Sequence, residues 1–128
     1  MQTEIYTLPE LTFVGGKTQE LRFNLKDNRG EPYDASGATV DFSVCNYSNK
    51  VGKPLFSITP VLFADENGIA DIMDVSIPSN ITADLYGKYI YQITIVDISG
   101  RVEIPNQGIM NITKNINKSF ISSIEGGK

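Results

Sequence analysis

Apolar and polar residues alternate along this chain in short runs, and that period of two constrains its fold more than any other feature. In one run, Leu21, Phe23 and Leu25 fall on one side while charged and polar residues fall on the other. Residues 89–96 repeat the pattern with apolar residues on part of both faces, which predicts a strand that is central or covered. Alternation of this kind is typical of β-strands and not of helices.

Turn-forming residues separate these runs. Three segments each join an aspartate, which can bond its own backbone, to a glycine that tolerates positive φ: Asp27-Asn28-Arg29-Gly30, Asp65-Glu66-Asn67-Gly68 and Asp97-Ile98-Ser99-Gly100. Pro60 predicts an edge strand or a bulge, because proline cannot donate a hydrogen bond to a sheet. Residues 105–108 are expected to break a strand for the same reason.

Together these segments predict one all-β domain. With residues 11–14 included, we expect an immunoglobulin-like antiparallel β-sandwich of about 7–8 strands over residues 1–114. One helical turn is expected within residues 79–85, capped by Ser79 or Asn80. The segment before residues 89–96 is similar to the tyrosine corner of sandwich domains, so Tyr89 and Tyr91 are expected in the core.

Residues 115–128 differ from the rest of the chain and predict a short C-terminal helical segment and a flexible end. Ile116, Phe120, Ile121 and Ile124 follow helical spacing and form one apolar stripe. One interpretation is the start of a stem helix that packs against copies of itself. The other is a helix folded onto its own domain, or a frayed end, since three turns alone are marginal in water.

The composition argues against catalysis. The chain has no histidine and a single cysteine, Cys45, which removes histidine-dependent nucleophiles, histidine-bearing zinc sites and internal disulfides. Asp65, Asp71 and Asp74 lack the spacing of an EF-hand calcium loop, so solvated carboxylates at a hairpin tip are favoured over the alternative of a calcium site shared between strand and loop. Gly15-Gly16-Lys17-Thr18 lacks the rest of a phosphate loop. We therefore expect no enzyme activity, no metal and no cofactor.

Charge and hydropathy limit the partners. The formal net charge of −4 and the scattered basic residues argue against nucleic acid. No apolar run approaches the length of a transmembrane helix, so no membrane span is expected, and residues 1–8 lack the features of a signal peptide. Tyrosine suits docking surfaces because it buries a large area with few rotatable bonds, and Tyr6 and Tyr47 are the candidates for such contacts.

The order of the strand and turn residues resembles that of a known family, the baseplate upper proteins of tailed phages of Gram-positive bacteria. Three stretches carry the likeness to its N-terminal immunoglobulin-like domain: VGGKTQELRFNLKDNRGEPYDASGATVDFSV, ADENGIADI and LYGKYIYQITIVDISGRVEIPNQGIMNI. The likeness covers residues 11–116. The positions that match are Leu21, Phe23, Leu25, Asp27, Gly30, Pro32, Asp34, Gly37, Ala38, Val40, Gly87, Tyr89, Tyr91, Ile93, Asp97 and Gly100.

The resemblance implies a non-enzymatic virion structural protein, assembled in the host cytoplasm, that docks to the particle and supports receptor-binding proteins. It also implies other virion proteins as partners and a homo-oligomer, with a trimer favoured. A long stem does not follow the sandwich here, so a baseplate, tail or fibre position stays open. The alternative is a carbohydrate-binding or adhesin-type module at the cell surface or outside the cell.

Overall fold

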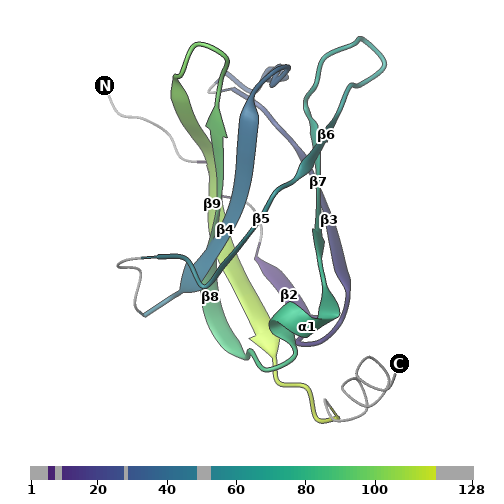
Figure 1. The fold of residues 1–128 in the computed structure, drawn as a ribbon, viewed down its shortest axis with the longest axis vertical. Helices are drawn as coiled ribbons and strands as arrows, with labels where there is room; N and C mark the ends of the chain where they lie inside the picture. The colour runs from purple at the N-terminus through teal and green to yellow at the C-terminus, as the bar shows by residue number, and fades with distance from the viewer. Residues whose placement is uncertain (1–5, 8–9, 28, 49–52, 118–128) are drawn as a thin grey trace.

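The computed structural model, which describes residues 6–7, 10–27, 29–48 and 53–117, consists of two β-sheets packed face to face (Figure 1). Its described strands and helix are β1 (Tyr6–Thr7), β2 (Leu11–Val14), β3 (Gln19–Asn24), β4 (Thr39–Asn46), β5 (Phe56–Ile58), β6 (Val61–Phe63), β7 (Ile72–Ile77), α1 (Ser79–Thr82), β8 (Gly87–Val96) and β9 (Val102–Thr113). The large sheet has the order β1-β9-β8-β4-β5, with β2 also paired to β9. The small sheet has the order β3-β7-β6. The prediction of an all-β sandwich is confirmed.

An aromatic cluster joins the two sheets at the centre of the core. Phe23 comes from the small sheet, and Phe42 and Tyr91 come from the large sheet; their ring centroids lie 5.6–6.1 Å apart. Each such pair contributes about 0.5–1.5 kcal/mol beyond the area it buries. Tyr89 is also buried, and its hydroxyl donates to the Tyr86 carbonyl at 2.9 Å, so the predicted tyrosine corner is confirmed.

The three predicted aspartate turns share one hydrogen-bond pattern. In the β8–β9 turn, the Asp97 carboxylate accepts from the backbone N–H groups of Ser99 and Arg101, both at 2.9 Å. The Gly100 N–H donates to the Asp97 carbonyl at 2.9 Å, with φ of 90° at the glycine. The turns that begin at Asp27 and Asp65 repeat these bonds residue for residue. Each turn is therefore closed by its own side chain.

Pro60 marks the place where the chain changes sheets. β5 pairs with β4 at the edge of the large sheet, and β6 pairs with β7 at the edge of the small sheet. Since both strands lie at edges, the proline removes no ladder bond, as the sequence predicted.

The prediction that residues 105–108 break a strand is wrong, because β9 continues through them. β8 pairs with β9 at Ile93↔Asn106 and again at Ile95↔Glu103, with a register shift between the two pairs. Pro105 lies in this bulge, where an extra residue is left out of the ladder and no N–H is required.

The expectation of a purely antiparallel sandwich is also wrong. β1 and β2 both run parallel to β9, with Tyr6 opposite Asn106 and Leu11 opposite Met110. Parallel pairing follows because the first and last strands lie side by side and enter the sheet from the same end. Sequence alternation carries no information about this choice.

The segment around α1 closes one end of the sandwich. The expected cap on Ser79 or Asn80 is wrong: Pro78 occupies the N-cap position without a side-chain bond. Instead, the buried Thr82 hydroxyl accepts from the Gly16 N–H at 2.9 Å. A Cβ at Gly15 would lie 2.5 Å from the Thr82 carbonyl oxygen, so only glycine allows this approach.

Acidification is expected to destabilise the fold through its hydrogen-bonded aspartates. Bonds from Glu31 and Arg29 N–H groups lower the pKa of Asp27, and bonds from Ser99 and Arg101 lower the pKa of Asp97, below the ordinary 3.8. A depressed folded-state pKa contributes stability that is present above 3.8 and is lost as pH falls through the folded value.

Urea unfolding should therefore show a falling midpoint below about pH 4. Asp97→Asn should lower stability at pH 7 and flatten this acid dependence, whereas Glu66→Gln at an exposed turn tip serves as the control. An unchanged acid slope in Asp97→Asn would contradict the assignment.

Replacement of Gly108 is expected to destabilise the fold because the Tyr91 ring lies against this glycine. A Cβ there would meet ring atoms and the hydroxyl of Tyr91 at 2.8–2.9 Å. Gly108→Ala should cost about 1–3 kcal/mol in the free energy of unfolding, measured by urea denaturation.

Tyr91→Phe provides the matched comparison. The buried Tyr91 hydroxyl has no hydrogen-bond partner among the described residues, so removing it should leave stability unchanged or raised. In the Tyr91→Phe background Gly108→Ala should cost less, because the contact with the hydroxyl is gone while those with the ring atoms remain. Equal costs in both backgrounds would exclude the hydroxyl as a part of the clash.

Candidate functional site

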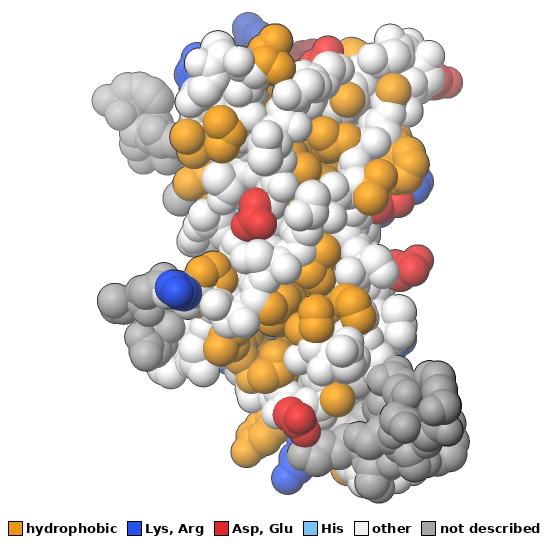
Figure 2. Space-filling view, in the orientation of Figure 1, with side chains coloured by type: hydrophobic (Ala, Val, Ile, Leu, Met, Phe, Trp, Pro, Cys, Tyr) orange, Lys and Arg blue, Asp and Glu red, His pale blue; other side chains and the backbone are white. Residues whose placement is uncertain are grey.

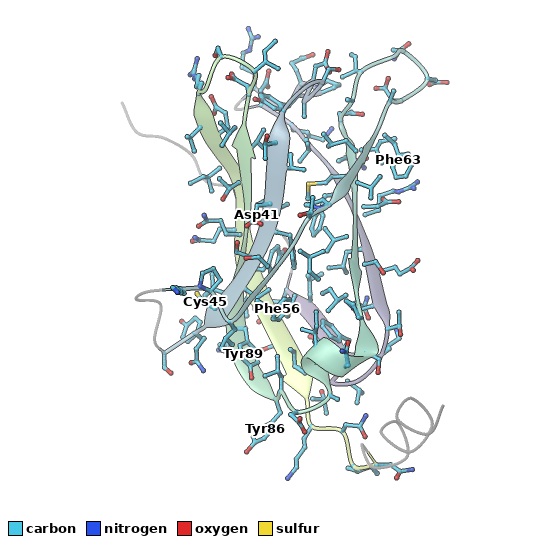
Figure 3. The ribbon with its side chains drawn as sticks, viewed as in Figure 1. Asp41, Cys45, Phe56, Phe63, Tyr86 and Tyr89 are labelled. Atoms are coloured by element: carbon cyan, nitrogen blue, oxygen red, sulfur yellow. The ribbon has the colours of Figure 1, made fainter. Side chains whose placement is uncertain are left out.

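The outer face of the large sheet, here called the large-sheet face, carries few charges. Figure 3 shows Asp41 and Cys45 on β4, from which this face extends across β8 and β9. Its partly buried side chains are Asp41, Ser43, Cys45, Ile90, Gln92, Thr94, Val96, Gln107, Ile109 and Asn111. No described helix or strand lies over it (Figure 1). A two-faced sheet thus leaves one face without a covering layer.

Strand register arranges this face in rows. Cys45 pairs with Ile90, and Ile90 pairs with Ile109, which gives one apolar row across three strands. The next row is polar: Gln107 donates to Gln92 at 2.8 Å. The apolar row therefore lies beside side-chain amides that already bond one another. The free thiol of Cys45 belongs to the apolar row.

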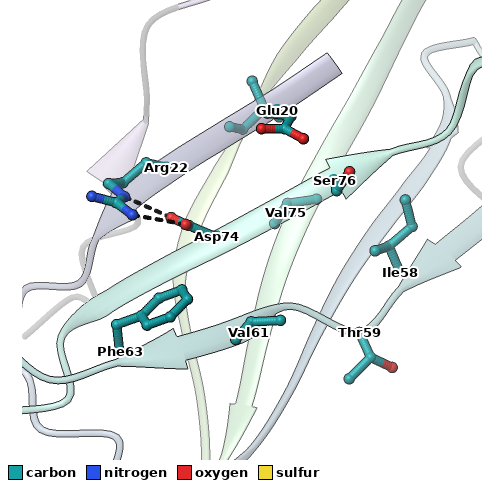
Figure 4. A pocket seen from close by; sticks show the side chains of 10 residues that line it. Glu20, Arg22, Ile58, Thr59, Val61, Phe63, Asp74, Val75 and Ser76 are labelled. Carbon is teal, nitrogen blue, oxygen red and sulfur yellow. Dashed lines mark hydrogen bonds and ion pairs between the residues drawn. The ribbon is translucent and has the colours of Figure 1, made fainter. Parts of the chain in front are cut away.

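A groove of about 500 Å³ lies over the small sheet (Figure 4). It is called the small-sheet groove and is lined by Glu20, Leu21, Arg22, Ile58, Thr59, Val61, Phe63, Asp74, Val75 and Ser76. Register places Arg22 opposite Asp74, and Asp74 opposite Val61. Val61 and Phe63 are 55% and 45% exposed, which is unusual for apolar side chains on a strand. The groove therefore combines an apolar wall with a fixed ion pair.

The ion pair in the groove has two parallel hydrogen bonds. Arg22 Nε donates to Asp74 Oδ1 at 2.7 Å, and Arg22 Nη2 donates to Oδ2 at 2.8 Å. This bonding lowers the pKa of Asp74 and raises the pKa of Arg22. Asp74 is consequently a carboxylate at neutral pH and cannot serve as a proton donor there. The Arg22 guanidinium carbon also lies 5.9 Å from the Phe63 ring centroid.

In the described ranges, no group of three or more cysteine and acidic side chains is placed to hold a metal ion. None of the helices described there has the length and hydropathy to cross a bilayer.

The contact residues expected from the sequence lie on separate segments. Tyr6 is in β1, Tyr47 follows β4 and is 41% exposed, and Ile116 follows β9 and is 98% exposed. The Lys88 ammonium lies 5.0 Å from the Tyr47 ring centroid. Ile116 and Asn117 lie in a turn. The other predicted stripe residues, Phe120, Ile121 and Ile124, lie outside the described residues.

Sequence reasoning did not identify the small-sheet groove. Arg22 and Asp74 are 52 residues apart in the chain, and only the β3–β7 register brings them together. The large-sheet face had a partial signal, since Ile90 and Val96 stand beside Gln92 and Thr94 on the more polar side of their run. The exposed apolar band where β5 and β6 cross the sandwich is visible in Figure 2, with charged side chains scattered around it.

No protein-family model and no curated protein matches this sequence. Among solved structures, CopC from Methylosinus trichosporium OB3b is similar in fold, with a TM-score of 0.44 and 9% identity over 83% of this chain and 88% of that chain. AggA, the major subunit of aggregative adherence fimbriae type I from Escherichia coli, has a TM-score of 0.37 and 12% identity over 83% and 91% of the two chains. Neither likeness bears on the function of this chain.

Proposed function

We propose that this chain is a non-enzymatic, immunoglobulin-like docking domain of a phage virion, held in the particle through its large-sheet face. The single observation that carries the docking role is the apolar row of Cys45, Ile90 and Ile109 on an uncovered, charge-poor sheet face. The tyrosine corner at Tyr89 and the two-sheet strand order support the immunoglobulin-like description.

The physical chemistry of the large-sheet face favours a protein partner. The cores of protein interfaces are depleted in charged residues. Asp41 is the one charged residue among the ten partly buried side chains of this face, and the exposed Lys88 follows on the same side of β8 beyond Ile90. The Ser43 hydroxyl donates to Asp41, and Gln92 and Gln107 bond each other. Covering these groups therefore leaves few polar atoms without partners, which keeps the desolvation cost of docking low.

The virion location rests on the sequence resemblance to the baseplate upper protein family. In that setting the partners are other structural proteins, and the position is a baseplate, tail or fibre. A homo-oligomer with a stem that starts within residues 115–128 is part of this proposal, because copies of an apolar stripe would cover one another. Of the stripe, the structure describes Ile116, which is 98% exposed. A trimer is favoured by the family resemblance alone.

Ile90→Asp tests the docking face. It would place an unpaired charge at the centre of the buried contact and should weaken association at least tenfold, roughly the effect of losing one central hot-spot residue. The measurement is co-expression of the full chain with the structural proteins encoded beside it, followed by affinity titration of the purified pair.

Ile98→Asp is the matched control, because Ile98 is 80% exposed on the β8–β9 turn and lies off the face. Circular dichroism should show that both variants keep the sandwich. Equal affinity of Ile90→Asp and the unchanged protein would exclude this face, and absence of any virion partner would exclude the docking role.

A second function, saccharide binding, is favoured by the small-sheet groove. A neutral sugar ring presents apolar C–H faces and a rim of hydroxyls, which match the exposed Phe63 ring and the oxygen atoms of Glu20 and Asp74. Two acidic side chains against the single base Arg22 disfavour an anionic ligand. This function would place the domain at a cell surface or in an adhesin.

Phe63→Ala should abolish saturable binding to neutral glycans on an array, because the ring supplies the apolar wall of the groove. Val102→Ala, at an exposed site outside the groove lining, is the control. Glycan binding that survives Phe63→Ala, or no binding by the unchanged protein, would reject the saccharide function.

A further inference from the structure

The first and last strands of the described chain are neighbours that run in the same direction. β2 pairs with β9 from Leu11↔Met110 to Val14↔Thr113, and β1 pairs with β9 further up the same strand. The chain enters this pair at the start of β1 and leaves it at the end of β9. A pull applied to the two chain ends therefore acts along the strands in opposite directions.

Pulling parallel neighbours in this way shears their hydrogen bonds. In shear every bond between the strands is strained together, so all must fail at nearly the same moment. An antiparallel hairpin pulled at its two open ends instead loses its bonds one at a time, as a zipper does. The same number of bonds thus resists much more force in the first geometry, because the rupture barrier contains them all.

Additional contacts reinforce the lower end of this strand pair. The Gly15 N–H donates to the Thr113 carbonyl at 2.9 Å, and Asn115 Nδ2 donates to the Gly15 carbonyl at 2.7 Å. At the upper end of β2, Asn111 Nδ2 donates to Glu10 Oε2 at 3.1 Å. These bonds flank the ladder, so β2 is tied to β9 at both of its ends.

The rest of the sandwich holds each strand in place. β9 pairs along its other edge with β8, from Gly87↔Ile112 to Val96↔Val102. Phe13 of β2 is buried in the core, so sliding β2 along β9 also drags this ring out of apolar surroundings. The pairing of β1 and β2 with β9 is consequently the first contact that tension between the chain ends must break.

We infer that β1, β2 and β9 form a tension clamp, through which the domain transmits a pull between its two chain ends without unfolding. This mechanical function is separate from docking and requires neither the large-sheet face nor a particular partner. It suits a domain that links a fixed body at one end to a moving or tethered body at the other. The force that the clamp resists depends on the direction of the pull and not on the free energy of unfolding of the whole domain.

Single-molecule force spectroscopy with two pulling directions tests the clamp. In a Cys45→Ser background, one sample is pulled through handles at both chain ends. The other carries Ile98→Cys and is pulled between the N-terminus and residue 98, which precedes β9. The second direction peels β1 and β2 from the start of β9. The native contacts are the same in both samples, so only the direction of the pull differs.

The rupture force between the chain ends should be roughly twice or more that of the peeling direction, since forced unfolding is governed by the barrier that the pull meets. Equal forces in the two directions would overturn the clamp.

Two proline variants provide a second measurement. Because the Gly15 N–H faces β9 and direction alternates along a strand, the Leu11 N–H faces β9 and the Thr12 N–H faces away. Leu11→Pro should roughly halve the end-to-end force, and Thr12→Pro should leave it unchanged, with urea unfolding measured for both. The clamp would be overturned if the rupture forces of the two variants differed only as their free energies of unfolding in urea do, regardless of which N–H group was lost.

Discussion

Contact between the Phe23 ring of the small sheet and the Phe42 and Tyr91 rings of the large sheet is the interaction on which the rest of this structure depends. The three rings set the spacing of the layers and the alternation of every strand that contributes one of them. Once these residues face inward, the residues between them must face outward. A strand has only two faces, so the residues that alternate with this buried cluster point to the surface. These outward residues form the large-sheet face and contribute to the small-sheet groove.

The sequence allowed the strands and turns to be predicted where the information is local. Alternation located the inward residues of β3, β4 and β8, and the Asp-to-Gly turns were predicted because each aspartate bonds its own backbone. The errors share a different cause. Pro105 is tolerated because a bulge forms opposite β8, and β2 runs parallel to β9 because two distant strands meet. Both facts depend on a neighbour in space that a local pattern does not specify.

The candidate sites were less predictable than the fold for the same reason. The Arg22–Asp74 pair and the row of Cys45, Ile90 and Ile109 exist only after the strand register is fixed. Residue type gave a weak signal in one case, since Ile90 is apolar on the more polar side of its strand. Tyrosine enrichment drew attention to Tyr6 and Tyr47, whereas the exposed aromatic ring in the groove belongs to Phe63. Residue counts thus indicated surface chemistry without locating it.

The pairing of β2 with β9 also decides when folding can finish. The β6–β7 and β8–β9 hairpins close over short turns and can form as soon as their own residues are available. β2 must instead wait for a partner at the far end of the chain; Asn115 and Gly15, which lock that end, are 100 residues apart. During synthesis the first strands would leave the ribosome long before β9. A nascent domain therefore remains open at one edge until β9 emerges, and the arrival of that strand acts as the trigger for closure.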